Sequence, residues 1–279
     1  MSLNRPLFLE KIDMNAIAKT QQLKTQLSQS QNQIKSLLGD KERAFRFMAA
    51  SLIVGTDSAL NQCSTDSIVN ALVGVAQLDL NPDKNVGHAY LVPYKGSCQL
   101  QVGYKGFIQL LFRAGWLVKA YPVYQCDEFE ISFDGWDNQV TFKPDIDARE
   151  DDDNNWVYNN LRGVYVIARN SETGDEYSDF VTKRLIEKTR LKSQNQKNPN
   201  KPEHIWADWY AEMARKTAVK KLAKALPIGD TRALTALALD DKATIGQPVD
   251  YKKTADEGVI IDAEPETSEI NLNEIANAA

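Results

Sequence analysis

Apolar residues recur at helical spacing in three stretches near the N-terminus. Residues 13–38 are rich in Gln, Ser and Lys with scattered Leu and Ile, which predicts a polar helix with a thin apolar stripe, ended by Gly39. Residues 44–54 and 67–78 predict core helices, the second with capping candidates at 64–66. The polar helix is expected to pack late in folding or to pack against another subunit.

The pattern changes to alternation after residue 86. Polar and apolar residues alternate over 88–92 and 98–102 around a turn at 94–96, which predicts a hairpin with one face in water. A short helix follows at 107–113, and further strands are predicted at 118–124, 129–133, 140–142, 161–168 and 177–181. Helices resume after Thr182. Because strands are grouped between helices without regular alternation, the sequence predicts an α+β fold with a small antiparallel sheet flanked by helices.

Charge is strongly segregated along the chain. The net charge of the 279 residues is -5. From residue 240 onward ten acidic residues face three lysines, a net of -7, so residues 1–239 carry +2. Residues 183–224 hold twelve basic and four acidic residues, a net of +8. This basic segment is the strongest electrostatic feature of the sequence and points to a polyanionic partner.

The segment from Trp206 to Leu226 has the length and composition of one helix. At 100° per residue, Lys216, Lys220 and Lys224 fall on one stripe, whereas the opposite side carries Ala218, Val219, Leu222 and Leu226 and faces the core. Like charges four residues apart repel, and no acidic residue of the helix lies on this stripe, so an external polyanion would relieve the repulsion.

Other interpretations of the basic helix are a solvated surface and a helix that binds a membrane or a calmodulin-type protein. The upstream residues 183–201 interleave bases with Ser, Gln and Asn, a composition that suits a phosphodiester backbone better than lipid. Aromatic residues near the bases are candidates for stacking on nucleobases, with core packing as the alternative role. They are Tyr94, Tyr104, Phe107 and Trp206.

Several functional classes find little support. Cys63, Cys98 and Cys126 lack the spacing of a disulfide framework or a zinc site, and residues 1–24 form neither a signal peptide nor a membrane span. No phosphate-binding GxxxxGK[ST] motif occurs, so ATP dependence and a cofactor are not expected. The acidic run 150–153 is interpreted as a solvated loop, with a metal site as the alternative.

A metal-dependent nuclease is a further alternative. Lys143, Pro144 and Asp145, followed by Asp147, resemble part of a nuclease motif. The Asp-x-Lys triplets, however, lie far away, at 240–242 and 250–252.

Six motifs in order resemble the RecT family of phage and prophage recombinases. They are QCSTDSIVNA at 62–71, AQLDLNP at 76–82, GHAYLVPY at 87–94, QLQVGYKGFI at 99–108, DEF at 127–129 and WYAEMARKTAVKKL at 209–222. The chain departs from the family at Asp79, where Gly is frequent, and at Lys220 and Lys221, where Arg is frequent.

The resemblance implies an oligomeric ring or filament that binds single-stranded DNA in a basic groove. Such a protein anneals complementary strands in recombination without nucleotide hydrolysis, has the annealed duplex intermediate as a partner beside the single strand, and has no catalytic residues. It also implies a 5′-to-3′ exonuclease partner, and a host single-strand-binding protein is a further candidate. The alternative is a protein-interaction module whose basic segment binds an acidic partner.

Carried onto this sequence, the resemblance gives a set of candidate DNA-binding residues. The basic members are Lys95, Lys105, Arg113, Lys183, Arg184, Lys188, Arg190, Lys192, Arg215, Lys216, Lys220, Lys221 and Lys224. The others, expected to let bases or backbone approach closely or stack, are Gln101, Gly103, Tyr104, Gly106 and Trp206.

Composition and patterning, together with the span of the motifs, divide the chain into three parts. Residues 1–40 are expected to hold an oligomerisation helix, 41–240 the DNA-binding and annealing core, and 241–279 a disordered acidic tail. A short amphipathic piece at 270–275 is a candidate for docking a partner. The protein is expected in the cytoplasm, because its three widely separated cysteines fit a reducing compartment.

Overall fold

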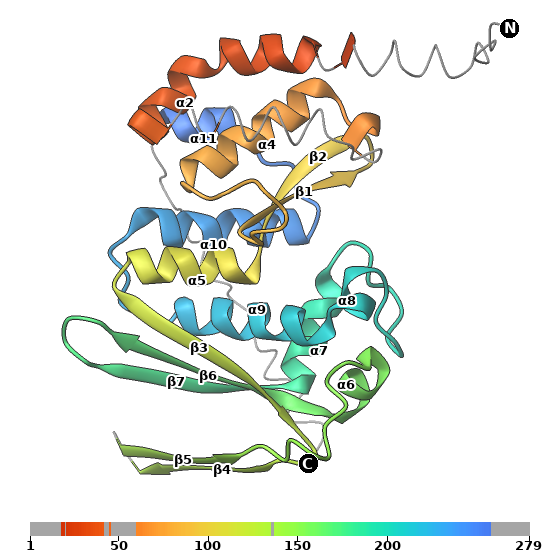
Figure 1. Ribbon diagram of the computed structural model, residues 1–279, viewed down its shortest axis with the longest axis vertical. Helices are drawn as coiled ribbons and strands as arrows, with labels where there is room; N and C mark the ends of the chain where they lie inside the picture. Colours follow the sequence, from red (N-terminus) through yellow and green to blue (C-terminus); the bar gives the residue numbers. More distant parts are fainter. Residues whose placement is uncertain (1–17, 20, 42–44, 46–59, 135–136, 258–279) are drawn as a thin grey trace, which may run out of the picture.

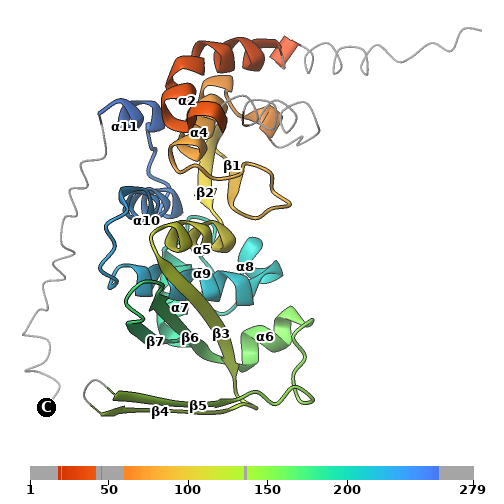
Figure 2. The ribbon, with the colours of Figure 1, turned by 60° about the vertical axis from the view of Figure 1, so that its left-hand side comes forward.

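The computed structural model describes residues 18–19, 21–41, 45, 60–134 and 137–257. Its elements are stacked along the long axis of the molecule, with helices at one end and a flat hairpin at the other (Figures 1 and 2). All strand pairings are antiparallel. The predicted α+β class with small antiparallel sheets is therefore confirmed.

The first layer consists of helices. Residues 21–29 are helical, and α2 (Gln31–Leu38), α4 (Thr65–Gln77) and α11 (Tyr251–Glu257) complete the layer, with the 3₁₀ turns η1 (Gly39–Lys41) and η2 (Leu60–Gln62). Leu23, Leu27 and Ile34 supply the buried stripe of the polar segment. A turn at residue 30 interrupts the single helix that the sequence predicted.

Two details of this layer follow from local sequence. Gly39 ends α2 at a φ of 54°, in the left-handed region that glycine tolerates. The Ser64 hydroxyl accepts a hydrogen bond from the Ser67 amide and caps α4, as its position predicted. Apart from Phe45, the helix predicted at 44–54 lies outside the described residues.

Below this layer lies the hairpin of β1 (Ala89–Tyr94) and β2 (Ser97–Val102), followed by α5 (Tyr104–Arg113). Lys95 and Gly96 form its turn with φ values of 48° and 79°, and both must be positive in the two-residue turn that matches strand twist. Glycines hold the start of α5 against the backbone before β1. A Cβ on Gly103 would lie 2.2 Å from the Gly87 carbonyl oxygen. A Cβ on Gly106 would lie 2.1 Å from the carbonyl oxygen of His88.

The second half of the stack is built on a three-stranded sheet of order β3-β6-β7: β3 (Trp116–Tyr124), β6 (Leu161–Asn170) and β7 (Glu176–Thr182). Val164, Val166 and Ala168 on β6 are fully buried, on the face that packs against α9 (Tyr210–Ala223). The hairpin of β4 (Glu128–Asp134) and β5 (Asp137–Lys143) covers the opposite face. There the Phe129 ring centroid lies 4.7 Å from that of Phe180 on β7.

The remaining helices are α6 (Asn154–Asn160), α7 (Lys183–Lys192), α8 (Ile205–Asp208) and α10 (Thr231–Thr244). The exposed acidic run 150–153 precedes α6, whose cap is the Asp153 carboxylate accepting from the Asn155 amide. The prediction of one helix from 206 to 226 is wrong. Trp209, with φ -139° and ψ 46°, separates α8 from α9, because a residue with these angles cannot continue an α-helix.

The predicted start of the disordered tail at residue 241 is also wrong. Residues 241–244 complete α10, and α11 packs against α4. The Asn70 amide group donates to the Val249 carbonyl at 2.8 Å, and its oxygen accepts from the Lys252 amide at 3.1 Å. Tyr251 is buried against Gly74. Residues 258–279, including 270–275, lie outside the described part.

The contact between Gly74 and Tyr251 can be tested by adding one methyl group. In Gly74→Ala the new Cβ would lie 2.5 Å from Cδ1 of the buried Tyr251 ring. Overpacking of this kind costs about 1 to 3 kcal/mol, offset by roughly 1 kcal/mol of helix propensity. We expect a net loss of up to about 2 kcal/mol in the free energy of unfolding, measured by urea denaturation.

Gly229→Ala is the matched control, because an added Cβ there has no neighbour within 4 Å. The loss in Gly74→Ala should vanish in a Tyr251→Ala background, since the clash partner is gone. An equal loss in both backgrounds would show that α11 does not pack on α4 in this way.

Candidate nucleic-acid interface

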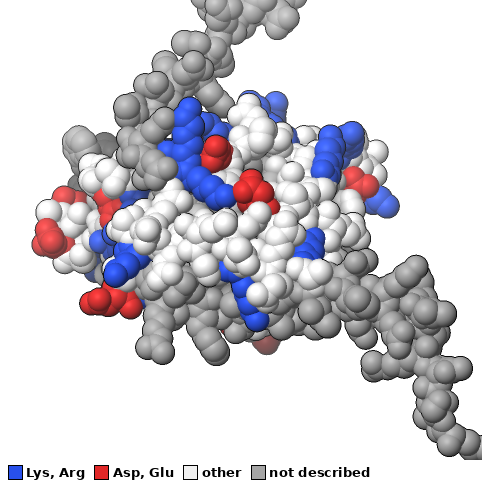
Figure 3. All heavy atoms as spheres, turned by 90° about the horizontal axis from the view of Figure 1, so that it is seen from above, with Lys and Arg blue, Asp and Glu red and all other residues white. Residues whose placement is uncertain are grey.

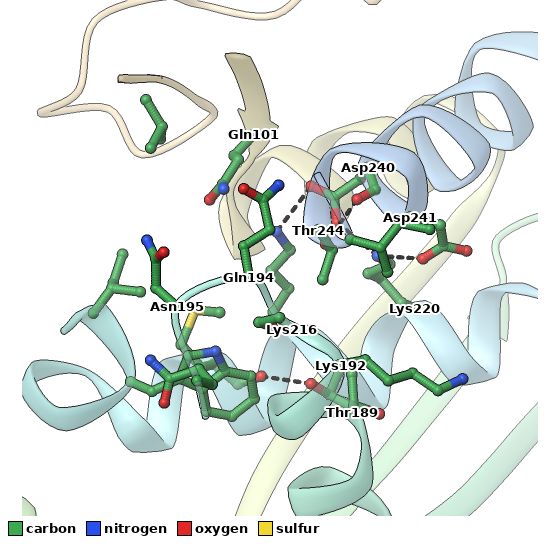
Figure 4. A pocket seen from close by; sticks show the side chains of 18 of the residues that line it. Gln101, Thr189, Lys192, Gln194, Asn195, Lys216, Lys220, Asp240, Asp241 and Thr244 are labelled. Atoms are coloured by element: carbon green, nitrogen blue, oxygen red, sulfur yellow. Dashed lines mark hydrogen bonds and ion pairs between the residues drawn. The ribbon is translucent and has the colours of Figure 1, made fainter. Parts of the chain in front are cut away.

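A groove of about 690 Å³ opens between the β1-β2 hairpin and the helices α7, α8, α9 and α10. Its lining combines ammonium groups, side-chain amides and a few rings (Figure 4). Lysines come from α7, from α9 and the residue that follows it, and from α10, and amides come from β2 and from the loop after α7. The principal lining residues are Tyr94, Gln99, Gln101, Lys192, Gln194, Asn195, Trp206, Lys216, Lys220, Lys221 and Lys224.

Two lysines of α9 reach up to α10, where they meet adjacent carboxylates (Figure 4). Lys216 Nζ lies 2.9 Å from Asp240 Oδ1, and Lys220 Nζ lies 2.6 Å from Asp240 Oδ2. Lys220 also contacts Asp241 Oδ1 at 2.7 Å, and Lys224 contacts Asp241 Oδ2 at 2.8 Å. The inference that no acidic residue offsets the lysine stripe is therefore wrong, because the partners come from another helix.

Asp240 is the centre of this cluster. Its carboxylate is fully buried and also accepts a hydrogen bond from the backbone amide of Val102 on β2, at 3.1 Å. Burial alone would raise the Asp240 pKa, but the charges of Lys216 and Lys220 outweigh it and lower the pKa to about 2. One carboxylate thus ties together α9, α10 and β2, three walls of the groove.

The ammonium groups of Lys216 and Lys220 also lie over an aromatic ring. Nζ of Lys216 and of Lys220 lie 5.8 and 5.7 Å from the ring centroid of Phe107, which is itself buried in the core. Burial lowers the pKa of Lys216, whereas for Lys220 the two carboxylates outweigh burial and raise it. Phe107, a candidate for base stacking, therefore serves as a platform for ammonium groups inside the protein.

Arg190 is buried and organises the loop of residues 193–204. Its guanidinium forks onto the Glu187 carboxylate at distances from 2.7 to 3.0 Å. Its Nη1 donates to the side-chain oxygen of Gln196 at 3.2 Å and to the carbonyls of Asn198 and Lys201 at 3.0 and 3.2 Å. Arg190 thus shapes one wall of the groove from inside, where a DNA backbone has no access to it.

Seven of the predicted residues line the groove: Gln101, Lys192, Trp206, Lys216, Lys220, Lys221 and Lys224. Lys221 also pairs with Asp179 on β7. Arg184 and Lys188 are exposed one turn apart on α7, so they extend the basic surface beyond the groove.

The other predicted residues have local partners or lie elsewhere. Lys183 donates to the Tyr158 carbonyl near the end of α6, Arg215 pairs with Glu212 at 2.7 Å, and Arg113 donates to the Asp79 carbonyl at 2.8 Å. Lys95 is exposed at the hairpin turn and Lys105 at the start of α5. Gly103 and Gly106 make room for backbone, as described above.

Among the aromatic candidates, Trp206 is 3% exposed and packs on Tyr210, with ring centroids 5.9 Å apart. Trp209, which sequence reasoning did not select, is 62% exposed. Its backbone amide donates to the Ile205 carbonyl, its own carbonyl accepts from the Met213 amide, and both of these residues line the groove. The signal was present, because Trp209 and Met213 continue the stripe of Lys216 and Lys220.

Comparison with known proteins shows what the motifs belong to. The sequence matches the RecT family over residues 45–253. It is 33% identical over 215 residues to Protein RecT of Escherichia coli strain K12, covering 73% of this chain and 74% of that protein. The chain belongs to the RecT family. Over 227 residues it is also 27% identical to the uncharacterized protein YqaK of Bacillus subtilis strain 168, covering 80% of this chain and 73% of that protein.

RecT-family membership makes this a protein of DNA recombination and annealing, and the family is not one of hydrolases. Membership also implies binding of single-stranded DNA and self-association. Seen from the end that carries α2, this RecT-family chain shows basic and acidic side chains interspersed over a largely uncharged surface (Figure 3). The concentration of lysines in the groove is not repeated in that view.

Carboxylates near the nuclease-like residues serve local structure. The Asp127 carboxylate is buried, receives the Arg149 guanidinium at 2.7 Å and accepts from the Asp145 amide at 3.1 Å. Within the described residues no three His, Cys, Asp or Glu side chains gather as a metal site. No helix in the same part of the chain has the length and apolar character needed to cross a bilayer.

Removing the charge of Asp240 should destabilise the RecT-family fold. Asp240→Asn leaves two ammonium groups facing a neutral amide, and breaking a buried pair costs about 3 to 5 kcal/mol. Because the folded-state pKa of about 2 lies below the ordinary aspartate pKa of 3.8, the wild type gains stability from ionised Asp240 above pH 4. This gain is lost as the pH falls from about 4 to about 2.

Urea denaturation of both proteins from pH 7 to pH 2 measures the effect. The difference between wild type and Asp240→Asn should be largest at pH 7 and should shrink below pH 4. Glu176→Gln, which removes an exposed acid of the β6-β7 hairpin, should show no such difference. A difference in unfolding free energy between the two proteins that stays constant down to pH 2 would contradict the assigned role of Asp240.

Proposed function

We propose that this protein binds single-stranded DNA in the groove between the β1-β2 hairpin and α9, and anneals complementary strands without ATP as an oligomer. The observation that carries the proposal is the convergence of six lysines and several amide side chains on one groove, from elements far apart in the sequence. Lysines placed along a channel neutralise successive phosphates, and the release of condensed counterions drives binding. Amide side chains add hydrogen bonds that do not depend on base identity.

Annealing needs no bond to be made or broken by the protein. It needs strands held extended, with their backbone charge neutralised so that two of them can approach each other. A groove lined by ammonium groups supplies that neutralisation, so no cofactor or catalytic residue is required. We further propose that residues 1–40 contribute to oligomer contacts, and that a 5′-to-3′ exonuclease and a host single-strand-binding protein are partners in the cytoplasm.

The exposed lysines at the rim of the groove give a direct test. Lys192 is exposed and the Lys224 side chain is 58% exposed, so their removal should leave the fold intact. In Lys192→Ala/Lys224→Ala we expect affinity for an oligo-dT strand to fall roughly tenfold at 0.1 M salt, with a salt slope shallower by about 1.4. The annealing rate of two complementary fluorescent oligonucleotides, without ATP, should fall in parallel.

Lys119→Ala/Lys143→Ala is the control, because these lysines lie on β3 and β5 and do not line the groove. It removes the same charge and should leave the salt slope unchanged. If wild type does not accelerate annealing but binds acidic peptides, the protein-interaction module replaces the proposal. If both double variants lose equal affinity, the site is not this groove.

Trp209 is proposed to stack on a nucleobase at the mouth of the groove, since it is exposed between two groove-lining residues. Stacking contributes about 1 to 3 kcal/mol per base, so Trp209→Ala should weaken binding of oligo-dT by roughly 5-fold to 150-fold. Trp209→Phe should retain most of the affinity. Fluorescence anisotropy with a labelled strand measures both.

The control separates stacking from a loss of shape. Leu117→Ala removes another exposed apolar side chain, 48% exposed on β3, and should bind as wild type does. On a strand of abasic sugar-phosphate the Trp209→Ala defect should disappear. An equal defect on that strand would rule out stacking.

A further inference from the structure

Two neighbouring carboxylates meet the lysines of α9, but their surroundings differ. Asp240 is fully buried and holds two ammonium groups and a backbone amide. The Asp241 side chain is 45% exposed, and its two oxygens bridge Lys220 and Lys224 at 2.7 and 2.8 Å. Among the described residues, no backbone amide donates a hydrogen bond to the Asp241 carboxylate. Asp240 is therefore fixed by the fold, whereas Asp241 is held only by the two lysines.

We propose that Asp241 is a phosphate placeholder: in the free protein its carboxylate occupies the position between Lys220 and Lys224 that a DNA phosphate takes on binding. The proposal rests on the proposed function and assigns a role to one residue of that site. It is independent of any motif, because Asp241 lies outside the six motifs that resemble the family.

The chemistry of the exchange is balanced. A carboxylate and a phosphodiester each carry one negative charge and present two oxygens to neighbouring cations. Lys220 and Lys224 lie four residues apart on one helix, so a single anion reaches both of them, as Asp241 does. The ammonium groups are point charges on flexible stems, so they can turn from one anion to the other without moving the helix.

The position of Asp241 allows its carboxylate to separate from Lys220 and Lys224. Its side chain is already 45% exposed, so it returns to water at small cost, whereas Asp240 would leave a buried cavity behind. Lys220 keeps its contact with Asp240 during the exchange, so its ammonium group is never unpaired. In the free protein Asp241 holds the two lysines in place. In the complex it competes with DNA, which limits affinity and speeds release of the strand.

Asp241→Asn tests the proposal. The amide keeps the shape of the side chain but removes the competing charge, so we expect the Kd for oligo-dT to fall roughly tenfold at low salt. The plot of log affinity against log salt should become steeper by about 0.7, as for one more phosphate contact. Dissociation of the bound strand, measured by stopped-flow with excess unlabelled competitor, should slow correspondingly.

Glu176→Gln is a closely matched control. It also removes one acid with a basic partner, and the Glu176 side chain is 44% exposed, on the β6-β7 hairpin away from the groove lining. It should leave Kd and dissociation rate as in wild type. Asp241→Glu, which keeps the charge, should also stay near wild type, and thermal unfolding of all variants checks that each is folded.

The outcomes separate the inference from the proposed function. If wild type anneals strands but Asp241→Asn matches its Kd and salt slope, the placeholder role is overturned and the annealing function stands. Equal gains in Asp241→Asn and Glu176→Gln would also overturn it, because net charge alone would explain them. If wild type neither binds nor anneals single strands, both proposals fall. If Asp241→Asn does not fold, Asp241→Ser is measured instead under the same criteria.

Discussion

The buried carboxylate of Asp240 is the interaction on which the groove depends. A charge taken out of water is costly unless it is paired and its remaining lone pairs are used, and here two ammonium groups and the Val102 amide meet both conditions. These partners come from α9 and β2, while the acid comes from α10. The three elements can therefore satisfy one another only in the arrangement that forms the groove, so the ion cluster fixes where the walls lie.

Arg190 does for the opposite wall what Asp240 does for this one. A buried guanidinium binds Glu187 and gathers carbonyl groups of the loop 193–204, a segment with no helix or strand up to the short α8. In both cases a buried charge costs desolvation and is offset by several directed contacts. Buried charges thus fix both walls, and Asp240 and its two lysine partners do so while they also line the groove.

The sequence predicted the fold class, the hairpin, the capped α4 and the core side of α9, because all of these follow from local periodicity and turn chemistry. Ala218, Val219, Leu222 and Leu226 are buried as predicted. It did not predict the partner of the lysine stripe, because Asp240 follows Lys220 by twenty positions across a turn, and no spacing rule within one helix reaches that far. For the same reason acids read as a solvated tail turned out to complete a folded helix.

The surroundings of the aromatic and glycine candidates could not be read from sequence for a related reason. Composition marks Trp206 and Trp209 equally, and only the backbone break at Trp209 turns one ring into the core and leaves the other in solvent. Likewise Gly103 and Gly106 read as open approaches for a ligand, yet carbonyl groups of residues 87–88 fill the space. A glycine signals that something comes close, but sequence does not say whether it is a ligand or the chain itself.

Lysine in place of arginine at position 220 fits this arrangement of charges. Arginine would bind a carboxylate through a planar fork with two parallel hydrogen bonds, a geometry that fixes one partner. The Lys220 ammonium instead contacts Asp240 and Asp241 at once, at 2.6 and 2.7 Å, and it lies over the Phe107 ring. Because the Lys220 ammonium already contacts one oxygen of Asp240 and one of Asp241, it can exchange the Asp241 oxygen for a phosphate oxygen while it keeps Asp240. Lysine at this position thus favours exchange of the anion over permanent capture.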